Sequence, residues 1–154
     1  MNSLLRVCFI FALLTSTESC VPADFDYANG AGGRYADWSG RWVVLNYWAE
    51  WCAPCRHEIP ELNALNHMLE GHSVLVVGIN YDGVHGPALP ALVTKMGIEF
   101  PVIDKDPRKH YGYDLPSVLP TTIVINPKGG VAATLVGPQT RESLQSLLGI
   151  TAPL

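Results

Sequence analysis

Two cysteines separated by two residues, Cys52 and Cys55, are the side chains of this sequence best suited to chemistry. They lie in the stretch WAEWCAPC. This spacing brings both sulfurs to one side of a helical turn, where a disulfide can form and reopen with little backbone movement. Three explanations fit such a pair: a structural disulfide, half of a metal site, and a dithiol that exchanges electrons with other proteins.

The structural and metal explanations account poorly for the pair. A disulfide across so short a loop constrains the unfolded chain little, so it adds little stability. A closed zinc site needs four ligands, and no second close pair of cysteines occurs in the sequence. A copper(I) chaperone needs a third soft ligand, and Met68 and Met96 are expected on helices elsewhere. We therefore expect redox exchange, with no metal and no cofactor beyond the Cys52–Cys55 disulfide.

The pair is predicted to lie where a buried strand leads into a helix. The continuous apolar run from Trp42 to Ala49 indicates a central strand, and apolar residues recur at helical spacing from Cys55 to Glu70. Cys52 would then face the unpaired N–H groups of the helix start, which stabilise a thiolate and lower the thiol pKa. Cys55 would be buried, and Pro54 fits a helix start because its missing N–H costs no intrahelical bond there.

Downstream of this junction, strands and helices alternate, and this order favours parallel strands with right-handed crossovers. The turn-rich tetrapeptide PKGG then predicts an antiparallel hairpin. The fold class is therefore α/β, with a mixed central sheet flanked by helices, a C-terminal β-hairpin and a last helix that Thr140 caps. The predicted strands are His72–Asp82, Phe100–Asp104, Thr121–Asn126 and Val131–Gly137, and the predicted helices are Leu89–Met96 and Arg141–Leu148.

The first twenty residues are typical of an export signal. A single positive charge precedes the apolar stretch from Val7 to Thr15, which is too short to span a bilayer as a helix. Two processing routes fit the sequence: acylation of Cys20, as in a bacterial lipoprotein, and cleavage after Ala23. We expect the protein in the periplasm, either free or held to the membrane by a lipid on Cys20.

Length and charge exclude other classes. A chain of 154 residues suits one domain, and a net charge of −4 without a basic cluster argues against nucleic-acid binding. The expected organisation is a signal peptide at 1–20, an N-terminal lead at 21–41 and one domain at 42–154. We expect a monomer whose contact with the membrane is limited to the lipid anchor.

The cysteine motif and two later segments resemble thioredoxin-fold proteins. The sequence from Trp51 to Cys55, followed by Pro60, is similar to the active-site motif and kinked helix of that fold. Leu119 and Pro120 before a β run are similar to its cis-proline strand, which implies a cis bond close to the cysteines. The exported N-terminus, the segment MGIEFPVID and Asn46 are most similar to the TlpA and ResA branch of exported thiol:disulfide oxidoreductases. The resemblance covers residues 42–148.

The resemblance implies a reductase of disulfides in exported proteins. Cys52 would attack a partner disulfide and Cys55 would resolve the mixed disulfide. Apocytochrome c is an implied substrate, and a membrane protein of the thiol-reducing type is the implied electron donor. The alternatives are the copper(I) module and a thiol peroxidase on the same fold, which needs a peroxidatic cysteine that this chain lacks. The implied substrate-contacting residues are Trp51, Ala53, Pro54, Leu119 and Pro120.

Proton transfer needs a different group from that of thioredoxin. Asn46 stands where thioredoxin has a buried aspartate, and an amide cannot titrate. Glu50, two residues before Cys52, is the candidate we single out for proton transfer. A carboxylate that is simply solvated is the ordinary explanation for a glutamate at this position.

Labelled palmitate distinguishes the two processing routes in cells that export the protein. Incorporation that disappears in Cys20→Ala is the result expected of a lipoprotein. A mature chain that starts at Asp24 and carries no label is the result expected of a free periplasmic protein. Retention of the unprocessed chain in the cytoplasm would contradict both routes.

Overall fold

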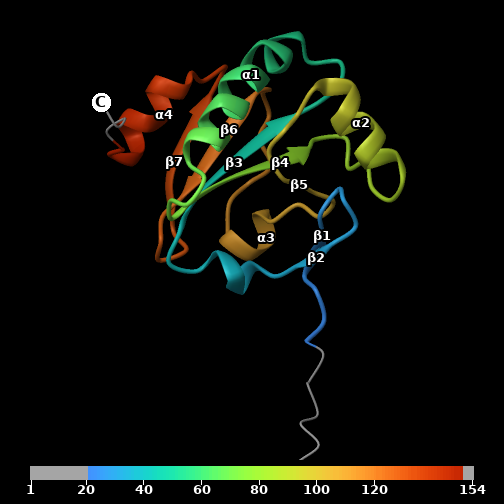
Figure 1. Ribbon diagram of the computed structural model, residues 1–154, viewed down its shortest axis with the longest axis horizontal. Helices are drawn as coiled ribbons and strands as arrows, with labels where there is room; N and C mark the ends of the chain where they lie inside the picture. The colour runs from blue at the N-terminus through green and yellow to red at the C-terminus, as the bar shows by residue number, and fades with distance from the viewer. Residues whose placement is uncertain (1–20, 151–154) are drawn as a thin grey trace, which may run out of the picture.

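A central sheet of five strands organises the computed structural model, which describes residues 21–150 (Figure 1). The strand order is β5-β4-β3-β6-β7, with β3, β4 and β5 parallel and β6 and β7 antiparallel to their neighbours. This arrangement confirms the mixed sheet and the C-terminal hairpin predicted from the sequence. The strands are β3 (Trp42–Trp48), β4 (Val74–Asn80), β5 (Val102–Ile103), β6 (Thr121–Ile125) and β7 (Val131–Val136).

Three of the four helices were predicted. The structure adds a short helix, a 3-10 turn and a two-stranded ribbon, all in segments without regular apolar spacing. The helix after the cysteines begins earlier than the apolar pattern alone suggests, because Cys52 caps it and Pro54 fits its first turn. The helices are α1 (Ala53–Met68), α2 (Ala88–Met96), α3 (Arg108–Tyr111) and α4 (Arg141–Leu148), and the other elements are β1 (Phe25–Asp26), β2 (Gly32–Gly33) and the 3-10 turn η1 (Tyr35–Trp38).

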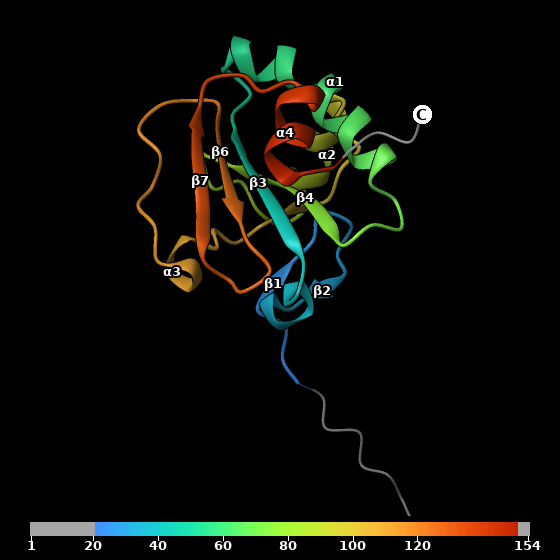
Figure 2. The same ribbon diagram turned by 90° about the vertical axis from the view of Figure 1, so that its left-hand side faces the viewer.

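Helices α1, α2 and α4 pack on one face of the sheet (Figures 1 and 2). Leu62 and Leu65 of α1 are fully buried there, together with Leu144 of α4. Thr140 caps α4 as predicted, since its hydroxyl accepts a hydrogen bond from the backbone N–H of Ser143 at 3.1 Å. Both cysteines belong to this core, so the packing that holds α1 on the sheet also holds the disulfide.

An aromatic layer covers the opposite face of the sheet. Phe25, Tyr35 and Trp38, from the lead that precedes β3, are buried there against the outer side chains of the strands. Tyr35 also stacks on His110 with ring centroids 4.4 Å apart. The lead therefore contributes part of the hydrophobic core, although its glycine-rich sequence carries no periodic pattern.

The expected leader, residues 1–20, and its Cys20 lie outside the described residues. Between residues 21 and 150, no helix is long and apolar enough to cross a bilayer. The described part of the chain therefore contains no membrane-spanning helix.

Gly78, in the middle of β4, is closely surrounded by side chains. A Cβ atom there would lie 2.9 Å from the Phe100 ring and 3.0 Å from both the Trp48 indole and Val102. We expect Gly78→Ala to lower the free energy of unfolding by about 1–3 kcal/mol, as overpacking does in other cores. Urea denaturation of the oxidised protein measures the change. A variant as stable as the wild type would contradict this account of the glycine.

Candidate active site

The end of β3 leads directly into the cysteine turn. Trp48 and Ala49 are buried, and the N–H of Cys52 donates to the carbonyl of Ala49 at 3.2 Å. Cys52 is the N-cap of α1, and its Sγ accepts a hydrogen bond from the N–H of Cys55 at 3.2 Å. A sulfur in this position meets the unpaired N–H groups and the positive end of the helix dipole. The geometry therefore favours a thiolate at Cys52 when the pair is reduced.

Cys52 and Cys55 form a disulfide, with Cα atoms 5.3 Å apart. Both residues are buried in this oxidised form, with exposed fractions of 3% for Cys52 and 0% for Cys55. Ala53 and Pro54, between them, are exposed at the surface. The surface next to the disulfide is therefore formed by the first turn of α1.

The peptide bond between Leu119 and Pro120 is cis, which confirms the prediction for this bond. Tyr47, next to the last residue of β3, pairs with Thr121, so Pro120 lies at the end of the sheet from which the chain leaves for Cys52. Leu119 packs against the core cluster that contains both cysteines. The structure therefore brings the two segments of the predicted site to one end of the sheet.

Trp51 presents its indole to solvent directly before the disulfide. Its side chain is 65% exposed, the largest fraction among the exposed large hydrophobic residues of the described chain. The indole Nε1–H donates to both carboxylate oxygens of Asp82, at 3.1 and 3.2 Å, and Tyr81 meets the ring edge-on at a centroid distance of 6.5 Å. These contacts fix an apolar surface beside the cysteines.

Glu50, the candidate for proton transfer, forms an ion pair on the surface. Its carboxylate is bound by the ammonium group of Lys95 on α2, and both side chains are substantially exposed. The hydrogen bond from Lys95, together with its charge, lowers the pKa of Glu50. Glu50 is therefore ionised at neutral pH and has no proton to give.

A second carboxylate, Glu58, lies buried one helical turn after Cys55. Its exposed fraction is 1%, and burial raises its pKa. Glu58 Oε2 accepts a hydrogen bond from Asn46 Nδ2 at 2.8 Å, and Oε1 accepts one from the N–H of Gln139 at 2.9 Å. Residues three apart on a helix share a face, so Glu58 lies on the side of α1 that carries Cys55. A buried carboxyl with a raised pKa is suited to take up and release protons.

Sequence reasoning missed Glu58 because a glutamate in the polar stretch RHEIPE reads as a solvated helix residue. The available signal was Asn46, a buried amide that needs a partner. Asn46 donates to Glu58 and to the hydroxyl of Thr122, at 2.8 and 3.2 Å. The carboxylate that the strand lacks is thus supplied by the helix to the same buried region.

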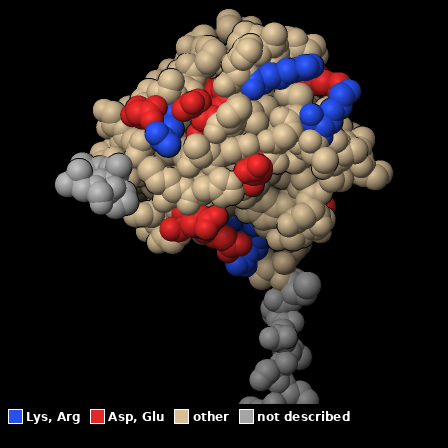
Figure 3. Space-filling view, turned by 45° about the horizontal axis from the view of Figure 1, so that its top comes forward, with Lys and Arg blue, Asp and Glu red and all other residues tan. Residues whose placement is uncertain are grey.

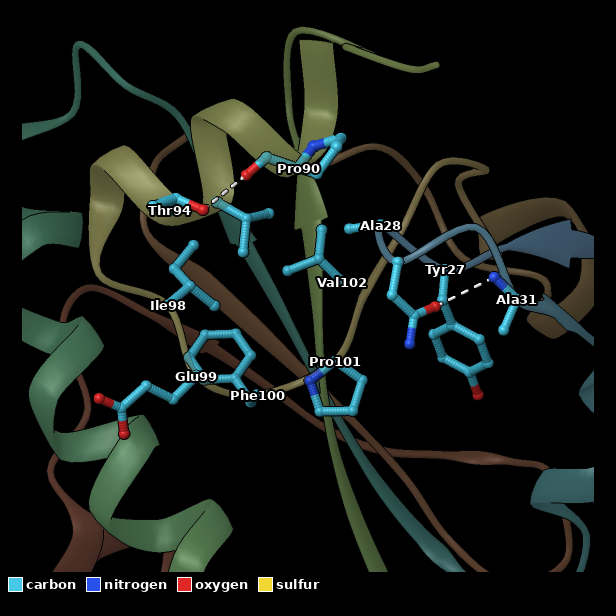
Figure 4. Close-up of a pocket in the computed structure, with 12 residues that line it drawn as sticks. Tyr27, Ala28, Ala31, Pro90, Thr94, Ile98, Glu99, Phe100, Pro101 and Val102 are labelled. Carbon is cyan, nitrogen blue, oxygen red and sulfur yellow. Dashed lines mark hydrogen bonds between the residues drawn. The ribbon is translucent and has the colours of Figure 1, made fainter. Parts of the chain in front are cut away.

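A large cavity of the described residues lies away from the disulfide. Its volume is about 560 Å³, and it is bounded by α2, β5 and the lead (Figure 4). Neither cysteine lines it.

Within residues 21–150, no group of three or more His, Cys, Asp or Glu side chains is placed to hold a metal ion. On the face shown in Figure 3, acidic and basic side chains lie next to one another in several small groups.

A parallel β3-β4-β5 core, an antiparallel hairpin after a cis-proline and a disulfide at the start of α1 define a thioredoxin-fold protein of the thiol-disulfide oxidoreductase class. Residues 20–134 match the AhpC/TSA family, and the chain belongs to that family. Its sequence is 32% identical over 126 residues to the thiol-disulfide oxidoreductase ResA of Bacillus subtilis, which covers 81% of this chain and 69% of that protein.

Solved structures agree with this assignment. A DsbF homologue from Corynebacterium diphtheriae matches with a TM-score of 0.66 and 30% identity, covering 84% of this chain and 85% of that one. A thiol:disulfide interchange protein from Chlorobium tepidum matches with a TM-score of 0.69 and 26% identity, covering 84% and 94%. The thioredoxin fold and the resemblance to the ResA branch are thereby confirmed.

Replacement of Glu58 should change how stability depends on pH. An unfolded glutamate titrates near pH 4.5, and the folded pKa of Glu58 is higher. The folded wild type therefore holds a proton that the unfolded chain has lost, and its stability falls as pH rises from about 4.5 through the folded pKa. Glu58→Gln does not lose stability in this way. The unfolding free energy of the wild type minus that of the variant should therefore decrease as pH rises across that range. Urea denaturation of the oxidised proteins at several pH values measures it.

Glu50→Gln is the matched control, because its ion pair gives the opposite sign. A lowered folded pKa adds stability above pH 4.5 that is lost as pH falls through the folded value. The difference between wild type and Glu50→Gln should therefore shrink on the acid side. A pH-independent difference for Glu58→Gln would contradict the raised pKa.

Proposed function

We propose that this protein reduces disulfides in exported proteins through its Cys52–Cys55 pair. The observation that carries the proposal is the disulfide itself, which lies at the N-cap of α1 beneath an exposed apolar surface that includes Trp51. A bond at a helix start, with an N–H aimed at one sulfur, can open to a stabilised thiolate. The similarity to a ResA thiol-disulfide oxidoreductase supports the same chemistry.

In the reaction, the thiolate of Cys52 attacks one sulfur of the partner disulfide and releases the other as a thiolate. A mixed disulfide joins Cys52 to the partner. Cys55 then loses its proton and attacks Cys52 Sγ, which frees the second partner thiol and leaves the Cys52–Cys55 disulfide. The protein loses two electrons and the Cys55 proton. The partner gains the two electrons, and its two thiolates become thiols with that proton and one more from water. Glu58 is the proposed acceptor of the Cys55 proton, because its raised pKa lets it hold a proton that an exposed carboxylate would release.

The proposed substrate surface consists of Trp51, Ala53 and Pro54 on one side of the disulfide and Leu119 and Pro120 on the other. Trp51, Ala53 and Pro54 are exposed, Leu119 is half-buried and Pro120 is buried behind it. Among the described residues, no backbone hydrogen bond outside the helices and sheets involves Leu119. Its main chain is therefore available to an extended partner segment.

The proposed setting is outside the cytoplasm. Residues 1–20 would act as the export signal, and the domain that follows would work in the periplasm, free or anchored by a lipid on Cys20. There it would meet exported disulfide-containing proteins, with apocytochrome c as the specific substrate implied by the ResA resemblance. A membrane protein of the thiol-reducing type would return two electrons to the Cys52–Cys55 disulfide, and no other cofactor is needed.

The two cysteines should fail in different ways when replaced. In Cys52→Ser, reduction of insulin by the protein should fall to background, because the attacking thiolate is gone. Cys55→Ser should keep the attack and accumulate mixed disulfides, since only resolution is lost. Non-reducing electrophoresis with mass spectrometry of the trapped species measures both outcomes. Faster iodoacetamide labelling of Cys55 than of Cys52 in the reduced wild type would reverse the assigned roles.

A further inference from the structure

The two edges of the central sheet differ in whether their backbone groups are hydrogen-bonded to another segment of the chain. At the β5 edge, the lead adds backbone contacts: the N–H of Ala28 donates to the carbonyl of Val102 at 2.8 Å, and the N–H of Asp104 donates to that of Asp26 at 2.9 Å. Strand β7 forms the other edge and pairs with β6 alone (Figure 2). Within the described residues, one edge is closed by the chain itself and the other is open.

The β7 edge carries few of the features that usually protect an exposed strand. Its sequence, VAATLV, contains no charged residue and no proline, whereas natural edges commonly carry lysine, proline or a bulge along the strand. The one register shift lies beside Ile125, next to the hairpin turn, and leaves the pairing of residues 133–136 regular. An uncharged, regular edge of this kind is suited to bind another extended chain.

The free hydrogen-bonding groups of the edge can be assigned from the register. The N–H of Gly137 donates to the carbonyl of Pro120 at 2.9 Å, so this pair is hydrogen-bonded. Hydrogen-bonded and non-hydrogen-bonded pairs alternate along an antiparallel ladder. The backbone groups of Leu135 therefore point toward β6, and those of Thr134 and Val136 point away from the sheet. An added strand would bond to these two residues.

A hollow lies beside these two residues. Thr134 and Val136 line a cavity of about 340 Å³ together with the loop that leads from α3 to β6. Leu115, Val118 and Val136 are 40%, 51% and 62% exposed, although all three are apolar. Asp114 is the one charged residue of the lining. Since side chains of an added strand alternate between faces, every second one would lie over this apolar cavity.

The cavity is continuous with the cysteine end of the sheet. The loop that lines it runs into Leu119 and Pro120, and the hydroxyl of Thr121 donates to the carbonyl of Val118 at 2.8 Å. A strand added to β7 would lie three strand spacings from β3, or about 15 Å. An extended peptide covers this distance in about four or five residues. One polypeptide can therefore reach both the disulfide and the β7 edge.

We propose that the free edge of β7 is a second docking site for the substrate polypeptide. The segment pairs with Thr134 and Val136 as an added strand and places an apolar side chain over Leu115 and Val118. This inference rests on the proposed function and names its substrate class. The class consists of unfolded exported chains with an uncharged, β-forming segment four or five residues from the cysteine.

Binding to the oxidised protein tests the site without catalysis. The probes are two fluorescent ten-residue peptides with serine in place of the cysteine and alternating valines four residues before it or after it. One of the two should bind, as measured by fluorescence anisotropy. N-methylation of one set of alternate residues should weaken its binding at least tenfold, and N-methylation of the other set should not, because only one set faces β7. Equal effects of both sets, or no binding of either peptide, would overturn the proposal.

Thr134→Pro is the decisive variant, because it removes an outward N–H and leaves the bonds to β6 in place. It should weaken peptide binding at least tenfold, whereas Val131→Lys, at the far end of the strand, should change it less than twofold. Circular dichroism establishes that both variants are folded. Undiminished binding to folded Thr134→Pro would overturn the proposal. So would a wild-type dimer in sedimentation velocity that Thr134→Pro converts to monomer, since that result assigns the edge to a second copy.

Turnover separates this inference from the proposed function. The protein, kept reduced by dithiothreitol whose direct reaction is measured without protein and subtracted, is given thionitrobenzoate mixed disulfides of a cysteine tripeptide and of the extended peptide. The extension should raise kcat/KM at least tenfold in the wild type, and Thr134→Pro should remove that gain. Failure to reduce either compound would refute the proposed function, and the anisotropy result would still decide the docking site. Equal kcat/KM for the two compounds in an active wild type would overturn the docking site alone.

Discussion

The buried carboxylate of Glu58 joins helix α1 to the central sheet and to the segment before α4 through hydrogen bonds. Glu58 projects from α1, and its two oxygens accept hydrogen bonds from Asn46 on β3 and from the backbone of Gln139 just before α4. Asn46 in turn donates to Thr122 on β6. A buried charge without such partners would cost several kcal/mol, so helix, sheet and the segment before α4 must keep these donors in place. The disulfide at the start of the same helix is held by that arrangement.

The two carboxylates near the cysteines differ in their surroundings, and their pKa values are shifted in opposite directions as a result. Glu50 lies at the surface beside Lys95, and the ammonium group keeps it ionised. Glu58 lies where water cannot solvate its charge, so the neutral form is favoured and its pKa rises. Environment, and not proximity in the sequence to Cys52, therefore sets the direction in which the pKa of each carboxylate is shifted. The amide at Asn46 fits this division, because it orients the carboxylate without competing for the proton.

The sequence predicts those parts of the fold that have a repeating or strongly local signal. The apolar run of β3, the PKGG hairpin and the Thr140 cap each depend on neighbouring residues, and each was predicted with bounds close to those observed. The cysteine site followed from spacing and from its place at a helix start. Glu58 could not be found in this way, because its burial depends on contacts with residues 12 and 81 positions away. The aromatic layer was missed for the same reason, since its residues come from segments without periodicity.

The aromatic layer also explains why the two sheet edges differ. Phe25 and Tyr35 pack the lead against the face of the sheet. Residues 26–28 therefore lie beside β5, and their backbone hydrogen bonds close that edge. No comparable segment of the described chain follows β7, because the chain turns at Gly137 and crosses to α4 on the opposite face. The open edge therefore falls beside the loop that ends at Pro120, at the end of the sheet where the disulfide lies. The path of the chain thus leaves the unpaired backbone groups of β7 beside the surface that we propose as the substrate site.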